Sequence, residues 1–310
     1  MTVACDGYAR TAALLDGAAT GKPAAGEFAV AAEFLAEVAS QHGLAPPSSP
    51  DEEIRVLEWL GIDAIGVALG DRSWRERLGS LAGRELFVWA VIDGPFQGLA
   101  GRPGLGEALR AMSALAPARD VLAPEHERVK GQLRDAIEGG ADGVVLGEDL
   151  SSSDGPLVSP RVVDERLVPL WREFSDLAGS LLTRRGRRPA RFLHCDGRVD
   201  WLLDRVVAAG FDGLHSLEPV AETRLRSPYR GRCRPNPVLV DLIERYGDRL
   251  VFWGGMPLSL LERGDPARVR SFVSGLRAAA RGGRFILGTT SGIVPPWVPR
   301  QALLAAYRRP

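Results

Sequence analysis

A histidine and an aspartate two residues apart, His194 and Asp196, end the apolar segment Arg191 to Gly197 (RFLHCDG). Residues two apart in a β-strand point to the same side, so we expect an imidazole and a carboxylate to share one face. Such a pair can bind a metal ion or act as acid and base in proton transfer. The alternative is a histidine that hydrogen-bonds its neighbour for structural reasons. Cys195, between them, is expected to face the other way as a small buried residue.

Polar residues also end other apolar segments. Glu218 ends residues 212–219 and is a candidate catalytic residue. Asp149 follows Glu148 directly, and because neighbouring residues of a strand face opposite sides, only one of the two is expected to point into a site. The catalytic candidates are His194, Asp196, Asp149, Glu218 and Asp93. The substrate-binding candidates are Glu148, His215, Met256, Thr290 and Ser291.

Eight short apolar segments, alternating with helix-like stretches, must position these residues. The predicted strands are residues 27–32, 63–69, 86–94, 142–149, 191–197, 212–219, 250–256 and 284–292. Between two of them, Ile54, Leu57 and Leu60 show helical spacing. Eight strands that alternate with helices favour an α/β fold, a (β/α)8 TIM barrel that forms a single domain over residues 1–310. In such barrels the residues at the C-terminal ends of the strands carry function.

Glycines and a long irregular stretch mark the connections. The links LGIDAI, GGADGV and AGFDGL repeat one order of helix, glycine, aspartate and strand, and glycine there suits the left-handed C-cap of a helix. An open dinucleotide-binding sheet is disfavoured, because Gly104-Leu105-Gly106 does not directly follow a strand. Residues 222–237 are basic and proline-rich. They predict a loop insertion on the catalytic face, either an active-site cover or a plain surface excursion.

Composition excludes several classes of protein. Lys+Arg and Asp+Glu number 39 each, and a neutral total disfavours a nucleic-acid partner. Three cysteines, an odd number without a CxxC pair, argue against a disulfide framework and fit a reducing compartment. No apolar run approaches the roughly 18 residues of a membrane helix, and no signal peptide is apparent. We therefore expect a cytoplasmic protein that has no membrane partner.

Four stretches resemble the uroporphyrinogen decarboxylase and corrinoid methyltransferase superfamily. Residues 194–219 (HCDGRVDWLLDRVVAAGFDGLHSLEP) are similar to its His-x-Cys-Gly strand and the helix and strand that follow. Residues 247–276 (GDRLVFWGGMPL…) resemble its Gly-Asp-Arg and Gly-Gly stretch. Residues 282–307 (GGRFILGTTSGIVPPW…) resemble its closing segment, and residues 140–174 its Asp-Asp-Leu-Gly stretch. The resemblance implies a (β/α)8 barrel enzyme that acts on a small or medium-sized molecule.

The methyltransferase branch of this superfamily uses zinc held by a histidine and two cysteines to activate a thiol, since zinc lowers a thiol's pKa. Cobalamin on a partner protein often carries the methyl group. Here the histidine position is His194, the first cysteine position is Asp196 and the second is Ser291. Both sulfur ligands are therefore replaced. The resemblance implies zinc or another divalent metal held by His194 and Asp196 with Glu218 or Asp149.

The decarboxylase branch uses no cofactor, and an aspartate stabilises the cation that develops as carbon dioxide leaves. Asp93 or Asp149 would take that role here. The branch's early arginine-rich signature is absent, and residues 21–35 take its place. Methyl transfer or demethylation, with a corrinoid protein as partner, is therefore the first prediction. Cofactor-free decarboxylation of a porphyrinogen-like or other aromatic acid is an alternative, and non-catalytic ligand or corrinoid binding is another.

Overall fold

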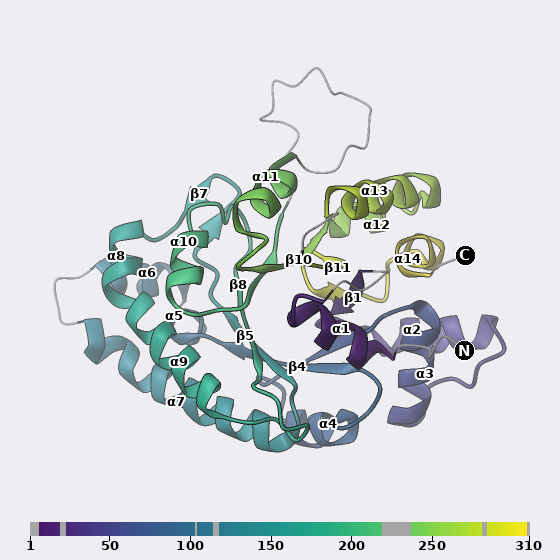
Figure 1. Ribbon diagram of the computed structural model, residues 1–310, viewed down its shortest axis with the longest axis horizontal. Helices are drawn as coiled ribbons and strands as arrows, with labels where there is room; N and C mark the ends of the chain where they lie inside the picture. Colours follow the sequence, from purple (N-terminus) through teal and green to yellow (C-terminus); the bar gives the residue numbers. More distant parts are fainter. Residues whose placement is uncertain are drawn as a thin grey trace. The chain divides into compact units, whose positions relative to one another are not determined.

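A computed structural model of the protein describes residues 6–18, 23–102, 104–113, 118–218, 237–280 and 284–308. Eight parallel strands close into a barrel in the order β1-β11-β10-β9-β8-β5-β4-β3 (Figure 1). They are β1 (Ala24–Glu27), β3 (Ala64–Ala68), β4 (Phe87–Asp93), β5 (Gly143–Gly147), β8 (Ala190–His194), β9 (Gly213–Ser216), β10 (Val251–Met256) and β11 (Phe285–Thr289). The (β/α)8 barrel predicted from the sequence is confirmed.

Helices alternate with these strands along the chain. They are α1 (Gly7–Leu15), α2 (Ala32–Gln41), α3 (Pro50–Leu60), α4 (Trp74–Leu81), α5 (Pro95–Ala100), α6 (Leu105–Ser113), α7 (Ala118–Gly139), α8 (Pro160–Arg166), α9 (Val168–Ser180), α10 (Leu203–Ala208), α11 (Pro237–Tyr246), α12 (Leu258–Glu262), α13 (Pro266–Ala279) and α14 (Arg300–Tyr307). The ends of α3 show why its sequence is helical. Ser49 Oγ accepts a hydrogen bond from the backbone of Glu52, and Gly61 adopts a left-handed φ of 88°.

The first strand lies earlier than predicted. Residues Ala24–Glu27 form β1, whereas Ala29–Val30 form a short strand, β2, that pairs with β12 (Ile293–Val294) outside the barrel sheet. The prediction of residues 27–32 followed the large apolar side chains and was wrong. This strand has no side chain at Gly26, which lies under the indole of Trp253, where a Cβ atom would approach the ring to 3.1 Å.

The chain divides into two compact units. One contains residues 1–66, 84–87 and 216–310, and the other contains residues 67–83 and 88–215. A buried tryptophan packs over glycines within each unit. In the first, Trp253 donates a hydrogen bond from Nε1 to the carbonyl of Gly26. In the second, Trp89 covers Gly143, where a Cβ atom would lie 2.5 Å from the indole. These strand glycines therefore provide space for large core side chains.

Aspartates clamp the starts of three strands. Asp63, Asp142 and Asp212 stand directly before β3, β5 and β9. Their carboxylates accept hydrogen bonds from the backbone N–H groups of Ala25, Val88 and Arg191 at 2.9, 3.0 and 2.9 Å. Each carboxylate also pairs with an arginine, namely Arg10, Arg185 and Arg191 in turn. The repeated glycine-aspartate links thus join neighbouring strands at their N-terminal ends, where a barrel keeps its stabilising rather than its catalytic residues.

A buried carboxyl at the end of β1 connects the barrel to α14. Glu27 accepts hydrogen bonds from the backbone N and Oγ1 of Thr289, at 2.7 and 2.6 Å, and from the Tyr307 hydroxyl. Burial raises the pKa of Glu27 to about 7, although these hydrogen bonds act in the opposite direction.

We expect Glu27→Gln to flatten part of the pH dependence of stability. Between its ordinary pKa of 4.5 and about 7, folded Glu27 holds a proton that the unfolded chain releases. The free energy of unfolding therefore falls as the pH rises through this window, by about 2–3 kcal/mol for this group. Urea unfolding of both proteins from about pH 5 to about pH 8 measures the difference. Parallel curves for wild type and variant would contradict the prediction.

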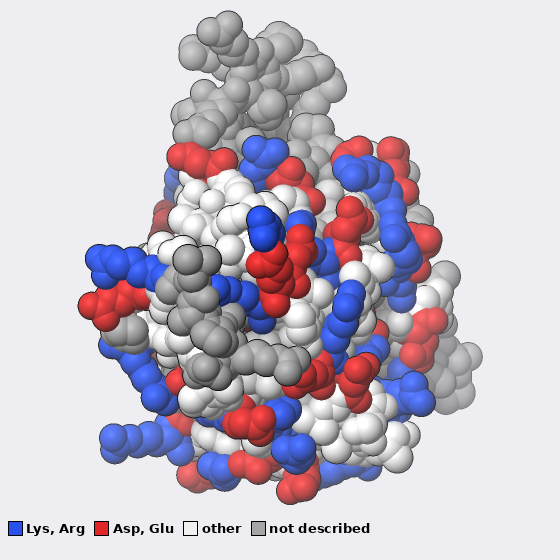
Figure 2. Space-filling view, turned by 90° about the vertical axis from the view of Figure 1, so that its left-hand side faces the viewer, with Lys and Arg blue, Asp and Glu red and all other residues white. Residues whose placement is uncertain are grey.

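Two expectations concern regions away from the barrel strands. The predicted insertion at residues 222–237 falls almost wholly on residues 219–236, which lie outside the described residues. In the described parts of the chain, no helix combines the length and apolar character needed to cross a membrane. On the face shown in Figure 2, basic and acidic side chains are interspersed.

Candidate metal centre

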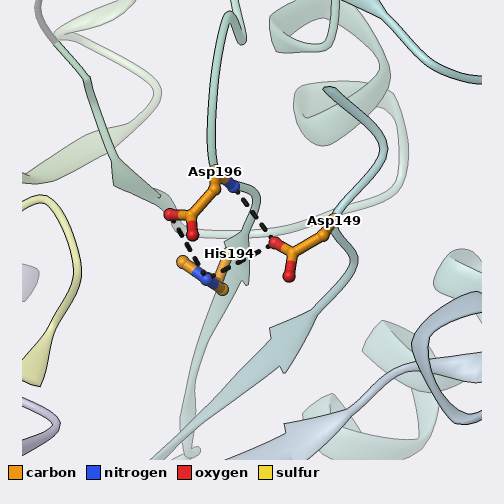
Figure 3. A group of neighbouring side chains, drawn as sticks. All are labelled: Asp149, His194 and Asp196. Carbon is orange, nitrogen blue, oxygen red and sulfur yellow. Dashed lines mark hydrogen bonds and ion pairs between the residues drawn. The ribbon is translucent and has the colours of Figure 1, made fainter. Parts of the chain in front are cut away.

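Asp149, His194 and Asp196 converge beyond the ends of β5 and β8 (Figure 3). His194 Nε2 lies 3.6 Å from Asp149 Oδ1 and 3.7 Å from Asp196 Oδ1. The side chain of His194 is 13% exposed, and those of Asp149 and Asp196 are 40% and 48% exposed. The histidine is thus held by the protein while both carboxylates remain open to solvent, so a small molecule can reach the group.

The spacing of these atoms suits ligands around one ion. Two ligand atoms bound tetrahedrally at zinc-like distances lie about 3.4 Å apart. The separations of 3.6 and 3.7 Å from His194 Nε2 are close to that value and exceed normal hydrogen-bond lengths. One ligand atom from each of the three residues lies within 4.8 Å of the others. The donor set is one imidazole nitrogen and two carboxylate oxygens, which suits a divalent cation of intermediate hardness.

Backbone hydrogen bonds position the segments that carry Asp149 and Asp196. Glu148 N donates to the carbonyl of His194 at 2.8 Å, which extends the pairing of β5 and β8 beyond the strands. Asp196 N then donates to Asp149 Oδ1 at 3.2 Å. The turn after Asp196 is fixed by Gly197, whose φ is 78° and whose Cβ would lie 2.7 Å from the backbone of Ser152. Only glycine fits this close, left-handed turn.

Glu148 points away from this group. It is fully buried, and its carboxyl accepts hydrogen bonds from Phe96 N, Gln97 N and Trp171 Nε1 at 3.0, 3.1 and 3.1 Å. It therefore caps the start of α5 and binds α9. Burial raises the pKa of Glu148 to about 8. Of the adjacent pair, Asp149 reaches the site, and the arrangement gives Glu148 a structural place instead of the substrate contact that the sequence predicted.

His215 is fully buried on β9, beside His194. The two histidines are register partners on neighbouring strands, and their Nδ1 atoms lie 2.8 Å apart. The sequence predicted a substrate contact for His215, whereas the structure shows a hydrogen bond to the other histidine. Both rings belong to the second compact unit.

The same register layer includes Asp93 and Gly147. Asp93 pairs with Gly147, and Gly147 pairs with His194. Since neighbouring strands lie about 4.8 Å apart, Asp93 is about 10 Å from His194 along this layer. Asp93 is exposed and lies outside the group of three. A Cβ atom on Gly147 would lie 3.9 Å from the His194 ring, so the glycine leaves room beside the imidazole.

The remaining candidates lie in the first compact unit. Glu218, one of the two residues considered as a third metal ligand, is exposed and is not part of the group, which contains the other, Asp149. Met256 is fully buried, and Thr290 is buried with its N–H bonded to the Met256 carbonyl at 2.9 Å. Ser291, at the position of the second family cysteine, is half-buried and donates from Oγ to the carbonyl of Ile293 at 2.9 Å.

Cys195 is buried, as expected, and burial raises its thiol pKa to about 12. In the absence of a metal ion the thiol therefore stays protonated at neutral pH and is a poor nucleophile. Sequence reasoning did not single out Gly147 or the pairing of His194 with His215. A glycine inside a predicted strand is a signal for close approach of another group. The histidine pair could have been found by aligning the ends of two consecutive predicted strands.

Comparison with known proteins supports the fold. No protein-family model matches the sequence, and no curated protein matches it. A methyltransferase from Methanosarcina mazei has a similar structure, with a TM-score of 0.68, 15% identity, and coverage of 97% of this chain and 97% of that chain. A fungal beta-1,4-galactanase gives a TM-score of 0.52 at 10% identity, covering 91% of this chain and 99% of that chain. At such identities the similarity establishes the barrel fold.

Proposed function

We propose that this protein is an enzyme that transfers a methyl group to or from a small molecule, using a divalent metal held by Asp149, His194 and Asp196. The carrying observation is the convergence of these three side chains, with His194 Nε2 at 3.6 and 3.7 Å from two carboxylate oxygens. The place of the group, at the C-terminal ends of barrel strands, is where such folds hold their active sites. The similar fold of a methyltransferase supports the reaction class.

The donor set favours one kind of metal site over another. Thiolate-rich zinc sites need cysteine, and the two positions at which the family resemblance places cysteine hold Asp196 and Ser291. One imidazole and two carboxylates suit zinc, manganese, iron or cobalt in the divalent state. A metal ion bound there would act as a Lewis acid and lower the pKa of a thiol or hydroxyl on the methyl acceptor.

The protein's own residues would orient the acceptor and accept its proton. The half-exposed carboxylates of Asp149 and Asp196 each have a second oxygen that can take a proton from the acceptor. The acceptor's lone pair then forms the new bond to the methyl carbon. The old bond breaks, and its electron pair leaves with the donor.

Metal content and methyl transfer together test this proposal. Elemental mass spectrometry of the wild type should find about one zinc, manganese, iron or cobalt ion per chain. His194→Ala should lose it, whereas the matched control His42→Ala, at the C-cap of α2, should keep it. Methyl transfer from free methylcobalamin to 2-mercaptoethanol or phenol, followed by the cobalamin absorbance, should fall at least about a hundredfold in His194→Ala alone.

Other outcomes favour the alternatives. If the wild type binds none of zinc, manganese, iron or cobalt, the proposal is overturned. Carbon dioxide release from porphyrinogens or aromatic acids that persists in excess chelator would point to cofactor-free decarboxylation. Tight binding of cobalamin without turnover would point to a binding protein. Methyl transfer that survives His194→Ala in a folded protein would remove the metal group from the reaction.

A further inference from the structure

The contact between His194 and His215 constrains the protonation of both rings. Their Nδ1 atoms are 2.8 Å apart, so one ring donates the proton of this hydrogen bond and the other accepts it. When His215 donates, neutral His194 carries its own proton on Nε2 and cannot bind a metal there. When His194 donates, its Nε2 keeps a lone pair, and that atom faces Asp149 and Asp196.

The fold fixes the geometry of this contact. His194 ends β8 and His215 lies on β9, and the two residues are direct register partners. The ring centroids are 5.0 Å apart with an interplanar angle of 44°. His215 is fully buried, and the Cys195 N–H donates to its carbonyl at 2.9 Å, which continues the strand pairing past His194. An acceptor is therefore built in behind His194, on the side of the ring opposite the two carboxylates.

We infer that His215 is a positioning residue that accepts the Nδ1 proton of His194 and thereby presents Nε2 to a divalent metal. The inference rests on the metal site proposed above and adds to it a residue that supports the histidine ligand. Metal-binding histidines commonly donate their other ring N–H to an acceptor that fixes the tautomer and the ring orientation. Here the acceptor is the buried imidazole of His215, for which the sequence predicted a substrate contact.

Two substitutions of His215 by residues of similar size separate the loss of the hydrogen-bond acceptor from the loss of side-chain volume. In His215→Asn the side-chain oxygen can occupy the position of Nδ1 and accept the same proton, whereas His215→Leu fills a similar volume without an acceptor. The probe is Co²⁺, titrated against a competing chelator and followed by its visible absorption, with near-ultraviolet circular dichroism to check the fold. His215→Leu should bind Co²⁺ about 10–100-fold more weakly than wild type. His215→Asn should stay within about threefold of wild type, because the acceptor is restored.

The outcomes separate this inference from the proposed function. If wild type binds Co²⁺ but His215→Leu binds it equally well, or both variants weaken equally, the positioning role of His215 is wrong and the metal site stands. If wild type binds no Co²⁺, the metal site and this inference both fail. Where a variant does not fold, nitrogen-15 histidine NMR of the zinc-loaded wild type decides. The spectrum should show a proton on His194 Nδ1. If that nitrogen carries no proton, the inference is overturned.

Discussion

Replacing Asp149 and Asp196 together by asparagine should lower divalent-metal affinity by about a thousandfold or more, and methyl transfer should fall with it. Each single substitution should cost at least about tenfold, because changes beyond the ligands themselves already cost 10–100-fold. Asparagine keeps the size of the side chain and removes its charge. The side-chain carbonyl oxygen of asparagine can still accept the hydrogen bond that the backbone N–H of residue 196 donates to residue 149. The backbone conformation of the loop should therefore be unchanged.

Asp154→Asn provides the matched control for these variants. Asp154 is an exposed aspartate in the turn between β6 (Ser151–Ser152) and β7 (Gly155–Pro156), close in sequence to Asp149 but outside the metal group. Asp154→Asn should leave Co²⁺ affinity and turnover unchanged. Isothermal titration with Co²⁺ and the methylcobalamin assay measure both quantities. A double variant that binds Co²⁺ like the wild type would show that the two carboxylates do not hold the ion.

Gly94→Ala should destabilise the protein by about 2–4 kcal/mol. A Cβ atom at this position would lie 2.4 Å from Cδ and 2.6 Å from Oε1 of Glu148. Glu148 cannot move aside easily, because three hydrogen bonds hold its buried carboxyl to α5 and α9. Urea unfolding measures the loss. Any shift of Glu148 also moves the next residue, Asp149, so the folded fraction of this variant should bind metal more weakly.

Two further variants test that explanation. Gly79→Ala, inside α4 with no atom within 4 Å of the new Cβ, should instead stabilise the protein by up to about 1 kcal/mol. Glu148→Ala removes the obstructing carboxyl, so the double variant Gly94→Ala/Glu148→Ala should lose less stability than the sum of the single losses. Additive losses would mean that Gly94 matters for a reason other than its contact with Glu148.

The barrel could be predicted from the sequence because most of its strands contain several large apolar residues and alternate with helices. The first strand escaped because Ala24, Ala25 and Gly26 do not form the apolar pattern that marks a strand. At Gly26 the lack of a side chain reflects packing against Trp253, a residue more than two hundred positions away. Such a constraint acts through the closed sheet and leaves no local signal.

The candidate site was predictable where it depends on spacing within one strand. His194 and Asp196 lie together as the two-residue period indicates. For the third member the sequence left Glu218 and Asp149 as alternatives, and the structure brings Asp149 to the pair. Leu217 adopts a left-handed φ of 63°, which breaks the strand alternation just before Glu218. Asp149 reaches His194 because β5 and β8 are neighbours in the sheet. The order of strands in a sheet cannot be predicted from the sequence of any single segment.

The aspartate clamps divide the barrel into modules along the chain. Asp63, Asp142 and Asp212 tie β3 to β1, β5 to β4 and β9 to β8, so each joins two strands that follow one another in the barrel. The residues before β4, β8 and β10 are Leu86, Pro189 and Leu250, which carry no carboxylate. New chain ends introduced by circular permutation should therefore be tolerated better between β3 and β4 than between β4 and β5, where a cut would separate two strands of one clamped module.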